Sequence, residues 1–182
     1  MAGTGETWPH LLKRYPNLRS IVAVDISSGM VKGAIGRLHA LRSDRIEIIE
    51  NDILKIPLEA EFADFVVCTF GLKTFNRDQQ SVIAAQVARI LKSGGVFSFV
   101  EASDPHSWIL RPFYNYYLRT ALPMIEKTFL RGAQDFAMLG VYSKAFLDCT
   151  HFATCLETQG LEIKFEKYFF GCATGVTGRK IK

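Results

Sequence analysis

The sequence predicts an α/β fold with a mostly parallel sheet, helices on both faces of that sheet, and an antiparallel hairpin at its C-terminal end. Short apolar strands alternate with amphipathic helices over residues 6–100, which is typical of parallel strands joined by helical crossovers. Two further strands, joined around Gly171, follow one another directly and indicate the hairpin. The pattern is Rossmann-like, so a ligand is expected beyond the carboxyl ends of the strands.

The chain opens with a glycine turn, residues 1–6, which reads Met-Ala-Gly-Thr-Gly-Glu. Gly3 and Gly5 can adopt positive φ and carry no Cβ, so the backbone can turn sharply and lie against a ligand. A predicted helix follows, and its free N–H groups are expected to face that ligand. The first predicted strand then ends at Asp25. A carboxylate about twenty residues beyond a glycine turn commonly binds a ribose diol in nucleotide-binding folds.

The turn and Asp25 together therefore predict one half of a nucleoside site. The alternative is a tight turn followed by an ordinary surface aspartate. A glycine turn of this kind normally follows a strand, whereas nothing precedes Met1. We therefore expect an N-terminally truncated sequence with its first strand missing. Such a strand would lie at the buried centre of a parallel sheet, so either another segment fills the gap or the isolated chain is only marginally folded.

Hydrophobic periodicity and punctuating residues predict the remaining elements. Ser27 is expected to cap the second helix, and a turn over residues 93–95 is expected to end the third. The predicted helices cover residues 6–15, 27–42, 78–92 and 143–159, and the predicted strands cover residues 21–24, 45–50, 65–70, 96–100, 161–170 and 173–181.

Several polar segments follow the predicted strands and are expected to meet at one edge of the sheet. They are Asp25, Asp52, residues 71–76 and residues 101–104. This convergence supports a ligand site more than any single residue does. Taken alone, Asp52 is equally well explained as a turn-forming residue.

The composition limits the classes of function. The chain has 182 residues, of which 48% are hydrophobic and 22% charged, as expected of one globular domain. Its net charge of +4 permits anionic partners but is too small to indicate nucleic acid. No apolar run approaches the roughly 18–20 residues of a membrane span. The four cysteines form no CxxC motif, so we expect buried thiols, a reducing cytoplasmic location and no metal site.

Residues 106–141 are expected to form a helical insertion, because aromatic and basic side chains interleave there. The insertion would cover a large apolar substrate, or contact a membrane surface through residues 108–131 with its basic side chains at the headgroups. The alternative is a core-facing helix with a solvated basic side.

Taken in order, seven segments resemble the motifs of class I S-adenosylmethionine-dependent methyltransferases and, more narrowly, of the ubiquinone/menaquinone biosynthesis C-methyltransferases. The resemblance covers nearly the whole chain. The segments are Met1–Glu6 as the first motif, Val24–Ser27 with Met30 as the ribose-binding strand end, Asn51–Ile53 on the adenine side, Phe70–Lys73 as the loop after the next strand, Ala88–Gly95 as the following helix and turn, Phe113–Pro123 as the aromatic insertion, and Gly175–Lys180 as the closing strand.

This resemblance implies a single methyltransferase domain over residues 1–182, with S-adenosyl-L-methionine as cofactor and a small aromatic, apolar acceptor such as a quinone precursor. It also admits a homodimer. The cofactor-binding residues that it implies are Ala2, Gly3, Thr4, Gly5, Asp25, Ile26, Met30, Asp52, Ile53, Phe70 and Gly71.

The sequence departs from the family after the Phe-Gly-Leu loop, where the usual Arg-Asn pair is replaced by Lys73-Thr74. Lysine keeps the charge but loses the planar fork of donors, and threonine cannot replace both amide functions. For catalysis we expect Lys73 to stabilise a ring oxyanion, and Tyr142 or His106 to handle or orient a proton. Alternatively, Lys73 is a solvated loop cation, Tyr142 only packs, and His106 is a turn residue.

Two other functions compete with methyl transfer. A nicotinamide-dependent oxidoreductase would share the glycine turn and Asp25, but it gives no reason for the closing hairpin. A non-catalytic methyltransferase-like scaffold in a membrane-associated biosynthetic assembly would explain the shortened first motif and the Lys73-Thr74 pair.

Overall fold

The computed structural model describes residues 1–106, 108–117, 120, 142 and 145–181. The chain forms two compact units, unit 1 over Met1–Glu59 and unit 2 over Ala60–Lys182. Within the described residues, no helix is both long and apolar enough to cross a bilayer.

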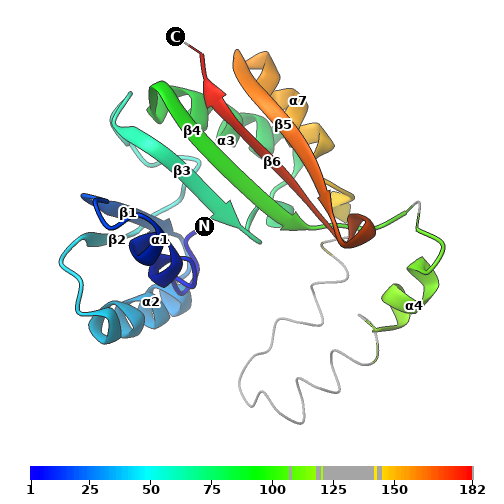
Figure 1. Ribbon diagram of the computed structural model, residues 1–182, viewed down its shortest axis with the longest axis horizontal. Coiled ribbons are helices and arrows are strands. Elements are labelled where there is room, and N and C mark those ends of the chain that lie inside the picture. The colour runs from blue at the N-terminus through cyan, green and yellow to red at the C-terminus, as the bar shows by residue number, and fades with distance from the viewer. Residues whose placement is uncertain (107, 118–119, 121–141, 143–144, 182) are drawn as a thin grey trace. The chain divides into compact units, whose positions relative to one another are not determined.

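Unit 1 contains two helices and a two-stranded parallel sheet, drawn in blue in Figure 1. The sheet pairs β1 with β2 so that Ile21 lies opposite Ile46 and Asp25 lies opposite Glu50. Both carboxyl ends therefore lie at the same edge, as predicted. The elements of unit 1 are α1 (Trp8–Arg14), β1 (Ile21–Asp25), α2 (Ser28–Leu41) and β2 (Ile46–Glu50).

The small core of unit 1 is built around Trp8, which is 2% exposed. Its ring packs with Ala23, Ala34 and Ile46, one residue from each of the other elements. A Cβ at Gly5 would lie 2.5 Å from the indole, and the φ of Gly5 is +78°. Glycine is thus required at this position by packing as well as by backbone geometry.

The predicted helix boundaries in unit 1 are close to those observed. The Ser27 hydroxyl accepts a hydrogen bond from the Met30 N–H at 3.4 Å and caps α2 as predicted. The other end of α2 is closed by Arg42, whose φ is 49°. The first helix begins at Trp8 rather than residue 6, because the turn of the glycine segment continues up to Thr7, which makes no side-chain cap.

Unit 2 contains a mixed sheet of four strands in the order β3-β4-β6-β5. Strand β3 is parallel to β4, whereas β6 is antiparallel to both β4 and β5. The predicted α/β fold with a closing antiparallel hairpin is therefore confirmed. The elements are β3 (Ala63–Thr69), η1 (Leu72–Thr74), α3 (Arg77–Ile90), β4 (Leu91–Ala102), α4 (Arg111–Tyr116), α7 (Thr150–Thr158), β5 (Leu161–Tyr168), η3 (Phe169–Gly171) and β6 (Ala173–Lys180).

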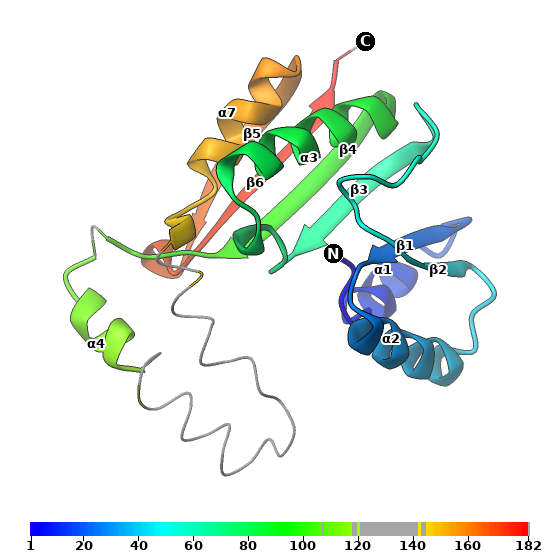
Figure 2. The same ribbon diagram turned by 180° about the vertical axis from the view of Figure 1, so that it is seen from behind.

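Helices α3 and α7 lie side by side on the same face of this sheet, as Figure 2 shows. Beneath them, the rings of Phe99 from β4 and Phe152 from α7 meet edge to face at 4.8 Å. Phe152, Leu156 and Val176 are each fully buried. Burial of each such side chain contributes about 1.5–3 kcal/mol to stability. More hydrophobic side chains are buried in unit 2 than in unit 1 among the described residues, so unit 2 has the larger core.

Two predictions for unit 2 were wrong in part: the turn over residues 93–95 and the start of the last helix. Residues 93–95 do not form a C-cap turn, because β4 begins at Leu91 directly after α3. Gly94, with φ +77°, instead belongs to an irregular start of the strand, beside a register shift between Ala63 and Phe65. The two steps from Ala63 to Phe65 lie beside the longer segment from Leu91 to Val96, and a bulge in β4 absorbs the additional residues.

The last helix begins at Thr150 rather than at residue 143. Leu147 adopts a φ of +65°, which interrupts any helix that arrives from upstream. The Asp148 carboxylate accepts a hydrogen bond from the Thr150 N–H at 2.8 Å and supports the new start. Of the predicted insertion, residues 107, 118–119 and 121–141 lie outside the described residues, and its first half contains α4.

Candidate functional site

The structure brings Asp25 and the glycine turn into direct contact. The Gly3 N–H donates a hydrogen bond to one carboxylate oxygen of Asp25 at 2.8 Å, and the Ser27 N–H donates to the other at 3.0 Å. The amino group of Met1 lies 3.4 Å from the first oxygen. Oδ1, which accepts only from Ser27, keeps a lone pair for a further donor.

Asp25 is ionised at neutral pH. Partial burial opposes its charge, but the N–H groups of Ser27 and Gly3 stabilise the carboxylate, and the pKa of Asp25 is lowered below its usual 3.8. An ionised carboxylate is an acceptor without a competing donor, which suits it to bind hydroxyl groups. A ligand hydroxyl can use the remaining lone pair of Oδ1.

The glycine turn is anchored to α2. The guanidinium of Arg37 donates from Nε to the Thr4 carbonyl at 2.7 Å. The Thr4 methyl lies against Gly33, where an added Cβ would come within 2.8 Å of Thr4 Cγ2. The positive φ of Gly3, +58°, then turns its N–H onto Asp25. Arg37 and Gly33 were not predicted to take part, because only the fold brings them to the turn.

Asp52 lies at the same edge of unit 1. The Asn51 N–H donates to the carbonyl of Asp25 at 3.0 Å, which continues the pairing of the two strands. The Asp52 side chain accepts from the Leu54 N–H at 3.0 Å, so it stabilises its own turn while keeping further acceptor capacity. Ile26 is 67% exposed and Met30 38% exposed, so apolar side chains accompany the carboxylates.

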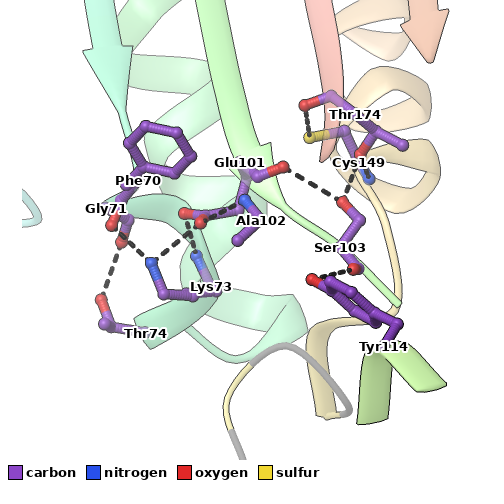
Figure 3. Close-up of polar contacts among 10 residues, drawn as sticks. All are labelled: Phe70, Gly71, Lys73, Thr74, Glu101, Ala102, Ser103, Tyr114, Cys149 and Thr174. Atoms are coloured by element: carbon purple, nitrogen blue, oxygen red, sulfur yellow. Dashed lines mark hydrogen bonds and ion pairs between the residues drawn. The ribbon is translucent and has the colours of Figure 1, made fainter. Parts of the chain in front are cut away.

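In unit 2, Lys73 and Glu101 form a buried ion pair, shown in Figure 3. Lys73 Nζ lies 2.9 Å from Glu101 Oε1, and the two side chains are 8% and 0% exposed. The alternative of a solvated loop cation is therefore wrong for Lys73. The ammonium also donates to the Phe70 carbonyl at 2.7 Å.

The loop after β3 is held in an unusual conformation. Phe70 has a φ of +59°, which a bulky side chain seldom adopts, and its ring is 57% exposed. The Thr74 hydroxyl donates to the Gly71 carbonyl at 2.8 Å. Asn76 and Gln79 then form a reciprocal capping box that starts α3. This capping box was not predicted, although its spacing was readable in the sequence.

Within the described residues, no hydrogen bond joins His106 or Tyr142 to the Lys73–Glu101 pair. His106 is exposed and belongs to a turn in which its N–H donates to the Asp104 carbonyl at 2.8 Å. Tyr142 is 39% exposed. Among the described residues, neither side chain makes a recorded hydrogen bond to Lys73, so their proton-handling roles stay predictions.

A buried polar chain that the sequence did not reveal runs from Glu101 to the start of α7 (Figure 3). The Ser103 hydroxyl donates to the Glu101 carbonyl at 3.2 Å and shares a 2.7 Å hydrogen bond with the Thr174 hydroxyl. The latter accepts from the Cys149 N–H at 3.0 Å. Tyr114 lies beside these hydrogen bonds. Burial, the largest cause, raises the pKa of Tyr114 to about 12, so its hydroxyl stays protonated.

The four cysteines are free thiols. Cys68 and Cys149 are buried as predicted, and burial raises their pKa to about 11 and about 12. The prediction was wrong for Cys155 and Cys172, which are partly exposed. Within the part of the chain that the structure describes, no group of three or more His, Cys, Asp or Glu side chains is placed to hold a metal ion.

The sequence matches a family model described as the ubiE/COQ5 methyltransferase family over residues 1–180. A demethylmenaquinone methyltransferase of Lactiplantibacillus plantarum is 23% identical over 180 residues, which cover 98% of this chain and 75% of the relative. A demethylmenaquinone methyltransferase of Bacillus cereus is 25% identical over 88% of this chain and 67% of its own length.

Solved structures share the fold. Human N-acetylserotonin methyltransferase in complex with SAM superposes with a TM-score of 0.66 at 19% identity, over 100% of this chain and 46% of the human chain. A SAM-dependent methyltransferase of Aquifex aeolicus gives a TM-score of 0.65 at 17% identity, over 99% of this chain and 79% of its own. The chain thus spans about half the length of the first of these structures.

Proposed function

Since this chain belongs to the ubiE/COQ5 methyltransferase family, whose methyl donor is S-adenosylmethionine, we propose that it methylates a ring carbon of a demethylated quinol. Two curated relatives that support this acceptor class carry the name demethylmenaquinone methyltransferase. The observation that carries the proposal is the contact between the Asp25 carboxylate and the Gly3 N–H. The family match also favours methyl transfer over the nicotinamide-dependent alternative.

The residues of unit 1 fit the donor. When bound, S-adenosylmethionine supplies an activated methyl group on a sulfonium. Asp25 is charged and stands at the end of β1 against the glycine turn, with acceptor capacity left on Oδ1, which suits it to bind a ribose hydroxyl. The exposed side chains of Ile26 and Met30 offer apolar surface to an adenine ring. We assign Asp52 and Ile53 to the same moiety, as the family resemblance implies.

Unit 2 supplies the residues that we assign to the acceptor. Attack by a ring carbon is helped when the neighbouring ring oxygen loses its proton and the resulting negative charge is stabilised. The Lys73 ammonium has three N–H donors, of which two bind the Phe70 carbonyl and Glu101. In the described part of the chain the third has no recorded hydrogen-bond partner, and we assign it to the ring oxygen. Tyr142 and His106 remain candidates for accepting the proton.

Donor binding is tested by calorimetry with S-adenosylhomocysteine on the wild type, D25N and the control D44N. The amide introduced by D25N would keep the shape of the side chain but lose its charge and one acceptor. We expect D25N to weaken binding about tenfold or more. Asp44 is an exposed aspartate in the same unit, so D44N should bind like the wild type. Equal affinities for D25N and D44N would contradict the assignment of Asp25.

Methyl transfer itself is tested with isotopically labelled S-adenosylmethionine and a short-chain demethylated naphthoquinol. The expected product carries the label on a ring carbon, which mass spectrometry locates. Binding of the donor product without transfer to any quinol would favour the scaffold alternative. Label found on oxygen would place the chain among O-methylating enzymes.

We also propose that the beginning of the insertion contacts a membrane surface. In support, Ile109 is 88% exposed and Phe113 72% exposed, and the Trp108 ring stacks on that of Phe170 at 5.3 Å. Arg111 is less available to lipid headgroups than expected, because both its Nε and one terminal nitrogen bind the Asp104 carboxylate. Sedimentation with anionic vesicles tests the proposal, and F113S should reduce the bound fraction.

A further inference from the structure

We propose that Glu101 is a positioning residue for the acceptor, which acts by holding Lys73. The inference rests on the proposed function and deepens it, because it names the group that aims the Lys73 ammonium. Glu101 had been expected only as one of several polar residues that follow the strands and form a ligand site, with no role of its own.

The Glu101 carboxylate accepts three hydrogen bonds, two of which come from Lys73. Oε2 accepts from the Lys73 backbone N–H at 3.0 Å, and Oε1 accepts from Lys73 Nζ at 2.9 Å. Oε1 also accepts from the Ala102 N–H at 2.7 Å. One carboxylate thus holds the same lysine at its backbone and at the end of its side chain, which removes most of the freedom of a long side chain.

Stability alone is a weak reason for such a pair. Taking two charges out of water costs several kcal/mol per ion, and buried pairs are often replaced by apolar residues without loss. The Lys73–Glu101 pair is almost completely buried. A functional reason is therefore the better explanation, and the position of Lys73 after β3 supplies one.

The loop depends on the pair for its shape. Lys73 Nζ binds the carbonyl of Phe70, whose backbone is in the left-handed region, so the ammonium links that strained residue to Glu101. At the far end of the loop, Gln80 donates to the Phe75 carbonyl at 3.0 Å. Release of Glu101 should therefore loosen residues 70–73 while the start of α3 stays in place.

Glu101 itself stands on a rigid support. It lies near the end of β4, the strand that pairs with both β3 and β6, and opposite Thr174 of β6. The Ser103 hydroxyl binds its carbonyl, as described above. A group fixed from a central strand can hold a loop side chain to within the fraction of an ångström that catalysis requires.

The first test is a double-mutant cycle with E101Q, K73M and the double variant, in which kcat and KM are measured for the quinol. If Glu101 acts through Lys73, E101Q should lower kcat about 100-fold when Lys73 is present and less than about threefold in the K73M background. The affinity for S-adenosylhomocysteine should change less than about twofold. Equal losses in both backgrounds would show a merely structural role and overturn the inference.

E162Q is the matched control, because Glu162 forms a surface ion pair with Arg179 at 2.6 Å. It should leave kcat, KM and donor binding unchanged. All assays are run well below the melting temperature of each variant, so that partial unfolding does not imitate lost positioning.

The second test does not depend on turnover. Hydrogen–deuterium exchange of residues 70–73 should be about tenfold faster in E101Q than in the wild type or E162Q. Unchanged protection would refute the inference that Glu101 holds the loop through Lys73, which we call the clamp. Faster exchange in E101Q, together with a wild type that methylates no quinol, would sink the proposed function while leaving the clamp standing.

Discussion

The two units present the same chemical group, a carboxylate at the end of a strand, in opposite settings. Asp25 in unit 1 accepts backbone N–H groups from a turn and keeps a lone pair on Oδ1 for a ligand. Glu101 in unit 2 is fully buried and is occupied by an ammonium and two N–H groups. We therefore propose a binding role for the first carboxylate and a positioning role for the second, because their surroundings differ.

The units also differ in how they are stabilised. Unit 1 has a two-stranded sheet and a core cluster of four buried residues, and a two-stranded sheet is only marginally stable by itself. Unit 2 has four strands covered by α3 and α7 over a core rich in phenylalanine. We therefore expect packing to dominate the stability of unit 2, and turn geometry and charge to matter more in unit 1.

The largest effect is expected from F152A in unit 2. Loss of this fully buried ring should lower the free energy of unfolding by about 3–5 kcal/mol. The control F113A removes the same atoms from a side chain that is 72% exposed, and it should change stability by less than about 0.5 kcal/mol. Denaturant unfolding, monitored through hydrogen exchange of β4, measures the free energy of unfolding of both variants. Similar losses for the two variants would erase the contrast between core and surface.

An intermediate effect is expected from G5A in unit 1. The alanine Cβ would meet the Trp8 ring at 2.5 Å, and φ is +78°, so unit 1 should lose about 1–3 kcal/mol. The control G36A lies in α2, where a Cβ meets nothing within 4 Å. It should stabilise the unit by about 0.5–1 kcal/mol. Exchange protection of β1 reports both changes, and a stabilising G5A would refute the packing argument.

The smallest effect is a pH dependence caused by Asp25. Its folded-state pKa lies below the usual 3.8, so it stabilises unit 1 fully above about pH 5 and loses this contribution as the pH falls through the lower folded-state value. The difference in unfolding free energy between the wild type and D25N should therefore shrink as the pH falls below about 5. D44N serves as the control for removal of one carboxylate. If the difference in unfolding free energy grew as the pH fell, the prediction for Asp25 would be wrong.

Local chemistry carried most of the fold prediction. The alternation of apolar strands and amphipathic helices, the Ser27 cap and the turn around Gly171 all depend on neighbours in sequence, and they were predicted correctly. The errors fell where tertiary pairing overrides local preference. Residues 93–95 joined β4 because the strand pairs with β3 from Leu91 onward, although two glycines after a helix normally indicate a turn.

The site divides in the same way. The glycine turn and Asp25 were identified from spacing, because a short turn and a strand end that lies about twenty residues later form one recurrent local unit. The Lys73–Glu101 pair was not identified, since 28 residues separate its members and only the parallel pairing of β3 with β4 brings them together. Residue order thus predicted the contact between the turn and Asp25 and the methyltransferase resemblance, whereas the burial that turned a loop lysine into half of an ion pair arose only when the strands assembled and excluded water.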